Sequence, residues 1–230
     1  MNQDRRDRLR DAAIAVLAEA GGRGLTHRAV DAAAGVPTGT AKNYFPTRDA
    51  LLRGAAERCE EQYRALAATL AEPGDGPGRE NGPGYGSGSG PGQGRGDGPG
   101  QGCGDGPGPW PADAAQLAAL LAGLLRNVAG PGRPRVLAVL ELQAEATRRP
   151  WLAALLDPVA AADFTAHAHL LRAAGLKAGP ERARALTLAL HGAITHLLTG
   201  APATLAAAGL DDLDRFAREL LAAVCEEETP

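Results

Sequence analysis

Glycine occupies every second position from Gly82 to Gly108, and no other feature of this sequence constrains its fold as strongly. A collagen triple helix is excluded, because it needs glycine at every third position. The surrounding stretch, residues 73–109, holds almost no apolar side chains, so burial cannot offset the entropy lost on ordering it. We therefore predict a disordered Gly/Pro-rich linker over residues 73–109, between two structured segments.

Those two segments have the composition of helices. Alanine and leucine dominate them, and aromatic residues make up only 3% of the chain, which favours helix over strand. We predict an all-α fold with an N-terminal three-helix domain over residues 1–50. A long helix over residues 51–72 leads from this domain to the linker, and a C-terminal helical bundle follows over residues 110–230.

Several function classes lack their usual sequence signals. No apolar run reaches the roughly 18 residues of a membrane span, and the charged N-terminus lacks the apolar core of a signal peptide. We therefore expect a cytoplasmic protein with no membrane partner. Cys59, Cys103 and Cys225 stand apart from one another and from any histidine at metal-binding spacing, so we expect no metal or other cofactor. Because nucleophile-elbow and phosphate-loop motifs are missing, we also expect no catalytic residues and no enzyme activity.

The N-terminal segment carries the signals of two short helices joined by a tight turn. Apolar residues at helical spacing predict a first helix over residues 3–20, ended by two glycines. Thr26 is a suitable N-cap for a second helix, and Gly35 follows that helix, where a turn can use a positive φ. Pro37 then favours the start of a third helix over residues 38–45. This arrangement predicts a helix-turn-helix.

The third predicted helix has one apolar side and one polar side. Ala41 and Phe45 lie four residues apart and point inward together. The residues that then point outward, where they can enter the major groove of DNA, are Thr38, Gly39, Lys42 and Asn43. The side-chain amide of Asn43 can read adenine by paired hydrogen bonds, and Lys42 suits a phosphate. A hydroxyl group of Thr38 or Thr40 can reach a base edge or a phosphate.

Basic residues gather near the N-terminus of a chain whose net charge is −3. Residues 1–58 contain ten Lys or Arg and seven Asp or Glu, against 24 and 27 in the whole chain. The N-terminal part is therefore net positive and the remainder net negative. Such a distribution suits a protein that presents one end to phosphates.

The stretch from Leu25 to Leu52, LTHRAVDAAAGVPTGTAKNYFPTRDALL, resembles the DNA-binding domain of the TetR family nearly position for position. Two positions depart from the family pattern, because Lys42 stands where an aromatic residue is usual and Ala41 where a bulky apolar residue is usual. The resemblance implies a DNA-binding transcriptional regulator, a repressor that a small-molecule effector releases from a palindromic operator.

The resemblance also implies DNA contacts beyond the third helix. It places the Tyr44 hydroxyl and the Arg48 guanidinium on backbone phosphates, with Thr26 and Arg28 as further contacts at the start of the second helix. The alternatives are that Tyr44 packs in the core and that Arg48 is a solvated charge. Two other functions stay open: an architectural DNA-binding protein without an effector, and a helical small-molecule carrier or enzyme.

The C-terminal segment is predicted to form five helices and a dimer interface. The helices are predicted over residues 112–129, 133–148, from 150 onward, 180–199 and 211–226. In the second of these, Val136, Leu137, Leu140 and Ala144 share an apolar face. The helix over residues 180–199 is apolar on nearly every side, so a second subunit is the simplest cover for it. We therefore predict a homodimer whose interface includes Leu190, Ile194, Leu197, Phe216 and Leu220.

A small-molecule site is predicted among the same helices. The residues predicted to line it are Gln143, Glu145, Trp151, Phe164 and His167. A ligand wedged there would shift the long fourth helix and change the spacing of the two recognition helices, provided that it binds the DNA-incompetent state more tightly.

Overall fold

A computed structural model describes residues 2–69, 110–177 and 179–225. Every regular element within these residues is an α-helix, so the predicted fold class is confirmed. The helices are α1 (Asn2–Gly24), α2 (His27–Ala34), α3 (Thr40–Tyr44), α4 (Arg48–Thr69), α5 (Ala114–Ala129), α6 (Arg133–Ala146), α7 (Pro150–Ala173), α8 (Pro180–Thr199), α9 (Pro202–Ala207) and α10 (Leu213–Cys225). The predicted linker over residues 73–109 lies outside the described residues.

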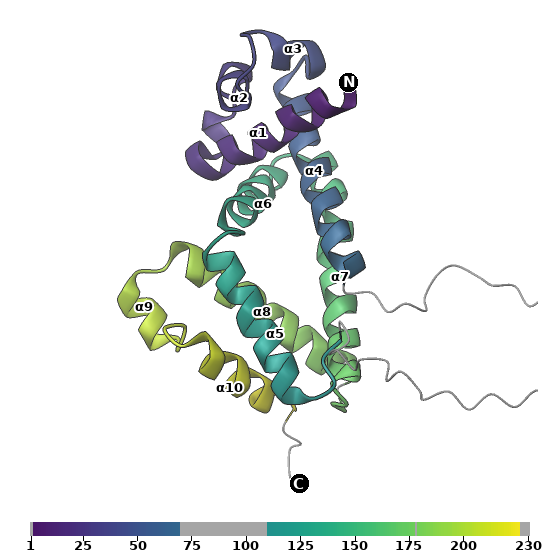
Figure 1. Cartoon of the computed structure of the whole chain (residues 1–230), viewed down its shortest axis with the longest axis vertical. Helices are drawn as coiled ribbons and strands as arrows, with labels where there is room; N and C mark the ends of the chain where they lie inside the picture. Colours follow the sequence, from purple (N-terminus) through teal and green to yellow (C-terminus); the bar gives the residue numbers. More distant parts are fainter. Residues whose placement is uncertain (1, 70–109, 178, 226–230) are drawn as a thin grey trace, which may run out of the picture.

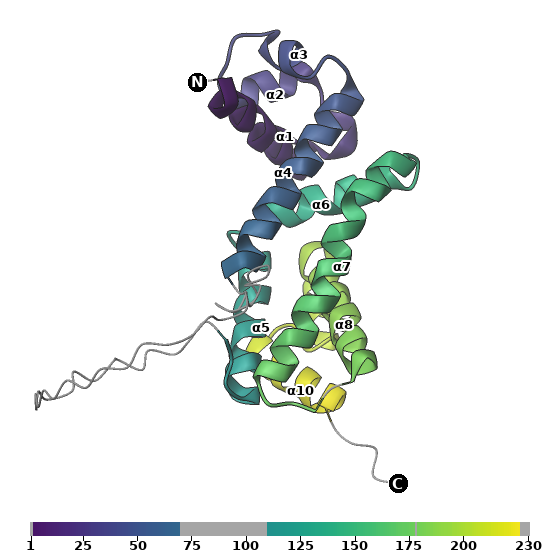
Figure 2. The same cartoon turned by 90° about the vertical axis from the view of Figure 1, so that its right-hand side faces the viewer.

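The molecule has two ends, which we call the head (α1–α3) and the body (α5–α10). Figure 1 shows the head at one extreme, with α4 leading away from it, and α8, α9 and α10 gathered at the opposite extreme. Helix α6 lies directly against α1, and α7 runs between the two ends (Figure 2). None of the helices in the described part of the chain is both long and apolar enough to cross a membrane.

Two separate hydrophobic cores correspond to these ends. The upper core joins α1–α4 to α6 and the first turn of α7, and its largest buried side chains are Leu9, Leu17, Leu25, Leu51, Leu52, Leu142 and Leu152. The lower core joins α5, the last turns of α7, α8 and α10, and its largest are Leu117, Leu121, Leu125, Leu171 and Leu186. Helix α7, about 36 Å long from its 24 residues, contributes to both cores.

The structure changes two of the predicted helices and adds one that was not predicted. Helix α1 passes Gly21, whose φ of 64° interrupts the helical path, and then adds a turn that ends at Gly24. Helix α3 begins at Thr40, two residues later than predicted, because Gly39 adopts a φ of 95°. The short helix α9 was not predicted.

The buried face of α6 also differs from the prediction. Its buried residues are Ala138, Leu142 and Glu145, whereas the predicted face around Leu140 is only half-buried. The reason is that α6 packs across α1 and α4, and that the charge of Glu145 is paired there with arginines. A carboxylate with such partners can be buried, and the apolar pattern alone does not reveal it.

Candidate nucleic-acid interface

The turn between α2 and α3 is built from local signals. The Thr26 hydroxyl accepts a hydrogen bond from the amide of Ala29 at 3.1 Å and caps α2. Gly35 ends α2 with a φ of 62°, and its amide bonds back to the carbonyl of Ala32. This left-handed backbone conformation costs glycine little free energy, because glycine has no Cβ. These features confirm the predicted ends of α2 and set the angle at which the chain enters α3.

A buried carboxylate holds α3 in place, and sequence reasoning missed it. Asp31 is 2% exposed, and its two oxygens accept hydrogen bonds from the amides of Gly39 at 2.7 Å and Ala41 at 2.6 Å. These amides belong to the first turn of α3, where helix donors lack partners within the helix. The only sequence signal was an acidic residue among alanines and valine on the inner side of α2.

The other end of α3 is tied to α2 as well. Nε2 of His27 donates to the carbonyl of Phe45, the residue after α3, at 2.6 Å. Ala41 and Phe45 point inward and are almost fully buried, at 0% and 2% exposure, as predicted. Because both ends and the inner side of α3 are held, its outer side has a defined orientation.

The outer side carries most of the predicted DNA contacts. Thr38, Lys42 and Asn43 are exposed, while Gly39, Thr40 and Tyr44 are half-buried. The Thr40 hydroxyl donates to the carbonyl of Pro37 at 2.6 Å, so its hydrogen is used inside the turn. Thr26 and Arg28, at the start of α2, are also exposed. The helices that carry these residues or follow them directly, α2 and α3, lie at one end of the molecule (Figure 1).

Arg48 differs from the other predicted contacts, because its guanidinium group is used inside the protein. It donates to the carbonyl of Leu25 at 2.5 Å and to the carbonyl of Gly22. It also lies 3.6 Å from the carboxylate of Glu145 on α6. In this arrangement Arg48 joins the end of α1, the start of α4 and α6 rather than pointing at a phosphate.

Two glutamates of α6 bind to α1 and α4 through hydrogen bonds and ion pairs. Glu141 accepts a hydrogen bond from the amide of Gly22 at 2.7 Å, at the point where α1 is interrupted. Glu145, one turn further, pairs with Arg48 and with Arg149, and Arg149 also pairs with Asp49 of α4 at 3.1 Å. We call these contacts the α6 clamp.

A second set of ion pairs ties α1 to α4. Arg10 is 4% exposed and bonds to Asp7 at 2.8 Å, Glu61 at 2.6 Å and the carbonyl of Gly54 at 3.0 Å. The hydrogen bond from Arg10 lowers the pKa of Asp7 and that of Glu61. Arg58 adds a further link, to Asp11 at 2.8 Å. The head is therefore fixed to α4 by directional polar contacts as well as by its core.

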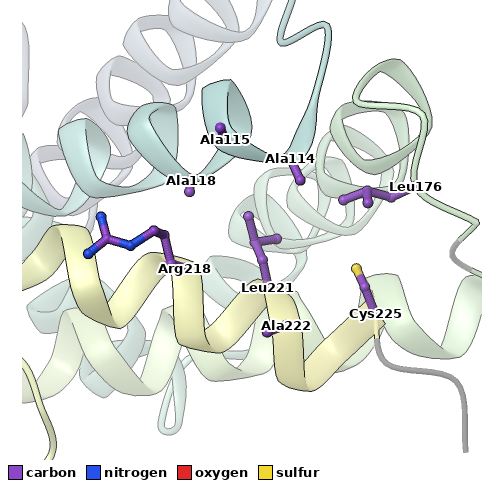
Figure 3. A pocket seen from close by; sticks show the side chains of 8 residues that line it. All are labelled: Ala114, Ala115, Ala118, Leu176, Arg218, Leu221, Ala222 and Cys225. Atoms are coloured by element: carbon purple, nitrogen blue, oxygen red, sulfur yellow. The ribbon is translucent and has the colours of Figure 1, made fainter.

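The lower end of the body contains a small apolar cavity. Its volume is about 300 Å³, and its lining residues from α5, the segment just after α7, and α10 are Ala114, Ala115, Ala118, Leu176, Arg218, Leu221, Ala222 and Cys225 (Figure 3). A second cavity of about 270 Å³ lies between α7 and the start of α8, and Phe164, His169 and Arg172 are among its lining residues.

The structure does not gather the five predicted ligand-binding residues around either of these cavities. Phe164 lines the second one, whereas Gln143 is exposed and Trp151 packs against the upper core with Arg53 stacked on its ring. Glu145 belongs to the α6 clamp. His167 is buried between α7 and α8.

Polar groups inside the body are few, and two pairs of them join α7 to α8, whereas the buried indole nitrogen of Trp110 has no hydrogen-bond partner among the described residues. Nδ1 of His167 lies 3.0 Å from the hydroxyl of Thr187, and burial lowers the pKa of this imidazole. His191 lies 2.9 Å from Asp163 across the same two helices. Among the described residues, no group of three His, Cys, Asp or Glu side chains is arranged to hold a metal ion.

The predicted dimer residues divide into two groups. Leu190 is 1% exposed and belongs to the lower core of its own chain, so it cannot face a partner. Ile194, Leu197, Phe216 and Leu220 are half-buried on α8 and α10. Leu188 on α8 was not in the predicted interface, and at 62% exposure it is the exposed large apolar side chain of the described residues.

Comparison with known proteins identifies relatives of this architecture. Residues 112–226 match the model of the tetracyclin repressor-like C-terminal domain. A member of the TetR family from Streptomyces coelicolor A3 is 26% identical, with 97% of this chain and 99% of that chain covered and a TM-score of 0.58. The multidrug binding protein EbrR, complexed with ethidium, is 30% identical, with 97% and 99% covered and a TM-score of 0.54. A search of curated proteins found no match.

A more distant structure agrees in fold. A transcriptional regulator from Rhodococcus sp. Rha1 is 20% identical, with 95% of each chain covered and a TM-score of 0.62. The family model spans half of the chain, and the helix-turn-helix stands at the end that this model does not cover. Together these findings show that the chain belongs to the TetR family of transcriptional regulators, which are not enzymes.

Proposed function

We propose that this protein is a repressor that binds a palindromic operator as a homodimer and leaves it when a small molecule occupies the body. The observation that carries the proposal is the outer side of α3. Lys42 and Asn43 are exposed there, Thr38 is exposed just before the helix, and Asp31 accepts hydrogen bonds from its first amides on the inner side. A short helix presented in this way has the dimensions to enter a major groove.

Each contact has a role in the proposal. Asn43 reads a base, Lys42 binds a phosphate, and Gly39 lets the backbone approach the duplex closely. Thr38 and Thr40 reach a base edge or a phosphate from the start of α3. The Tyr44 hydroxyl and the exposed Thr26 and Arg28 bind phosphates beside the groove. We leave Arg48 out of this set, because its donors are used by carbonyls and by Glu145.

Substitution of the two exposed residues of α3 tests this docking. The probe is a duplex that the wild-type protein selects from a random-sequence pool, and affinity is measured at several salt concentrations. We expect Lys42→Ala to weaken binding to all duplexes alike and to reduce the salt slope by about 1 per contact. We expect Asn43→Ala to relax the preference at one base pair of each half-site, at about 1–3 kcal/mol.

Three outcomes would contradict the docking or its interpretation. If neither substitution changed affinity, α3 would not be the recognition helix. If the wild-type protein selected no duplex, the whole proposal would fail. Protection spread evenly along DNA, without a palindrome, would favour an architectural DNA-binding protein without an effector.

The dimer is proposed to form through the outer faces of α8 and α10. Leu188 is exposed on α8, and Ile194, Leu197, Phe216 and Leu220 are half-buried on α8 and α10. Two such faces related by a two-fold axis would cover each other as a four-helix interface. A dimer also supplies the two recognition helices that a palindrome requires.

The effector is proposed to be an apolar or aromatic small molecule. The cavity between α5 and α10 has an almost entirely apolar lining, and about 300 Å³ is at the lower limit of ligand sites. EbrR, which is similar to this chain, is described as a multidrug binding protein and was crystallised with ethidium and with malachite green.

We propose that α7 and α6 transmit the presence of the effector to the head. Leu176, just after α7, lines the cavity, and Leu152, in the first turn of α7, is buried in the upper core. A displacement of α7 would therefore reach α6, whose clamp holds α1 and α4. This path complements the predicted shift of α4.

Ethidium and malachite green are the first compounds to test, by thermal shift and by release of the selected duplex. A compound that raised the melting temperature without releasing DNA would contradict the coupling.

A further inference from the structure

The first turns of α1 carry three arginines beside the helix-turn-helix. We infer that Arg5, Arg6 and Arg8 form a second DNA-binding patch, which contacts backbone phosphates outside the groove that α3 reads. This inference rests on the proposed function, because it requires α3 to dock on a duplex. It assigns particular residues to the basic N-terminal part that the charge distribution indicated, and these residues lie outside the stretch that carries the family resemblance.

The position of the patch follows from its contacts with both ends of the α3 segment. The guanidinium of Arg6 lies over the ring of Phe45, 5.1 Å from its centroid, and Phe45 directly follows α3. A guanidinium nitrogen of Arg8 would lie 3.5 Å from a Cβ placed on Gly35, in the turn before α3. Figures 1 and 2 both show the N-terminal end of α1 at the same end of the molecule as α3.

The charges of the patch are not used in ion pairs inside the protein, although the Arg6 guanidinium also contacts the Phe45 ring. Among the described residues, Arg5, Arg6 and Arg8 have no carboxylate within ion-pair distance. The nearby acids are already engaged, since Asp7 pairs with Arg10 and Asp4 has a partner of its own. Arg10 follows on the same helix, but it is buried and its guanidinium is paired with Asp7 and Glu61. The arginines of α1 therefore change from unpaired to ion-paired within a few residues.

Exposure and chemistry then indicate the ligand. Arg5 and Arg8 are exposed and lie three residues apart, so they are neighbours on one side of α1. A guanidinium group has the fork of donors that matches a phosphate, and it stays charged at any physiological pH. On a surface that already meets a duplex, the regularly spaced anions within reach are the backbone phosphates. Such contacts position the protein but carry no sequence information.

The test compares exposed arginines at the two ends of the same helix. The variants are Arg5→Gln, Arg8→Gln and the double variant, and the control is Arg23→Gln in the last turn of α1. Arg6 is kept, because its contact with Phe45 also supports the core of the head. Affinity for the duplex that the wild-type protein selects is measured against salt concentration, and hydroxyl-radical footprints are recorded.

We expect the double variant to make the slope of log affinity against log salt less steep by about 3–4, because two contacts per subunit are lost at about 0.9 each. Sequence preference should not change, and protection should be lost only on the backbone that flanks each half-site. Arg23→Gln should leave the slope and the footprint unchanged.

The failures of the inference and of the proposed function are distinguishable. If the wild-type protein selects a palindrome and Asn43→Ala relaxes it, but the double variant keeps the wild-type slope, the inference is overturned and the proposed function stands. The same holds if Arg23→Gln lowers the slope as much as Arg8→Gln does. If the wild-type protein binds no duplex, both the inference and the proposed function are overturned. Circular dichroism and melting temperature verify that the exposed glutamines leave the fold intact.

Discussion

The head and the body of this protein are both helical, yet they are held together by different kinds of contact. In the head, buried Asp31 and Arg10 make hydrogen bonds of 2.6–3.0 Å that join α2 to α3 and α1 to α4. In the lower part of the body, leucines and alanines dominate, and His167 with Thr187 is the buried polar pair among the described residues.

The difference has a physical consequence for each region. A hydrogen bond to a charged group depends on direction and distance, so it fixes the orientation of a helix. Apolar packing depends on volume and tolerates small displacements and changes of side chain more readily. The region proposed to read DNA is thus held by directional bonds, and the region proposed to respond to small molecules is held by contacts that can adjust.

The largest effect on DNA affinity is expected from a substitution at Leu188, the exposed apolar side chain of the body. Leu188→Glu places a charge on the proposed dimer face and should convert the protein to monomers, as sedimentation would show. Affinity for the selected palindrome should fall by about a hundredfold or more, because the two half-sites would no longer be bound together. Ala161→Glu, on an exposed position of α7, is the control. A dimeric Leu188→Glu protein with normal affinity would remove this face from consideration.

A smaller effect is expected from breaking a directional bond of the head. Asp31→Ala leaves the amides of Gly39 and Ala41 without their partner, at a cost of about 1–3 kcal/mol for each buried donor. We expect operator affinity to fall by about tenfold or more, while the dimer persists. Asp31→Asn keeps one acceptor oxygen and should lie between the two. Urea unfolding and duplex binding measure the two effects, and an unchanged affinity for Asp31→Ala would show that α3 does not need this support.

The smallest expected effect is a difference between the two cores in how their stability depends on pH. Burial lowers the pKa of His167, so the lower core should lose stability as pH falls below the ordinary imidazole value of about 6.5. The hydrogen bond from Arg10 lowers the pKa of Asp7 and Glu61, so the head should lose stability only as pH falls below about 4. One proton limits the first slope to about 1.4 kcal/mol per pH unit.

The two tryptophans can report the two cores separately. Trp110 packs against the lower core and Trp151 against the upper core, so Trp151→Phe and Trp110→Phe leave one reporter each. The urea midpoint reported by Trp110 should decrease first on acidification, and His167→Gln should remove that decrease. Coincident midpoints at every pH would mean that the two cores unfold as one unit, and the contrast between them would then be limited to structure.

Local signals made the helix-turn-helix predictable from the sequence. Thr26 and Gly35 act within a few residues of themselves, and the four-residue spacing of Ala41 and Phe45 determines which side of α3 is inward. The outward direction of Lys42 and Asn43 follows from that spacing alone. The predicted all-α class followed equally directly from composition.

Contacts between distant residues could not be predicted in this way. Glu145 is buried because Arg48 and Arg149 surround it, and Arg48 is almost a hundred residues away in the sequence. For the same reason the buried face of α6 and the inward position of Arg48 were missed. Leu190 was assigned to the dimer because an apolar pattern cannot distinguish a chain's own core from the surface of a partner.

The α6 clamp also has a consequence for protein engineering. A Cβ placed on Gly22 would lie 2.6 Å from a carboxylate oxygen of Glu145, and Glu141 bonds to the amide of the same glycine. A chimera that joins α1–α4 to the body of another regulator would therefore lose the contacts of α6 with the last turn of α1. Grafts that exchange α6 together with α1–α4 keep these contacts, so the workable junction lies after residue 149.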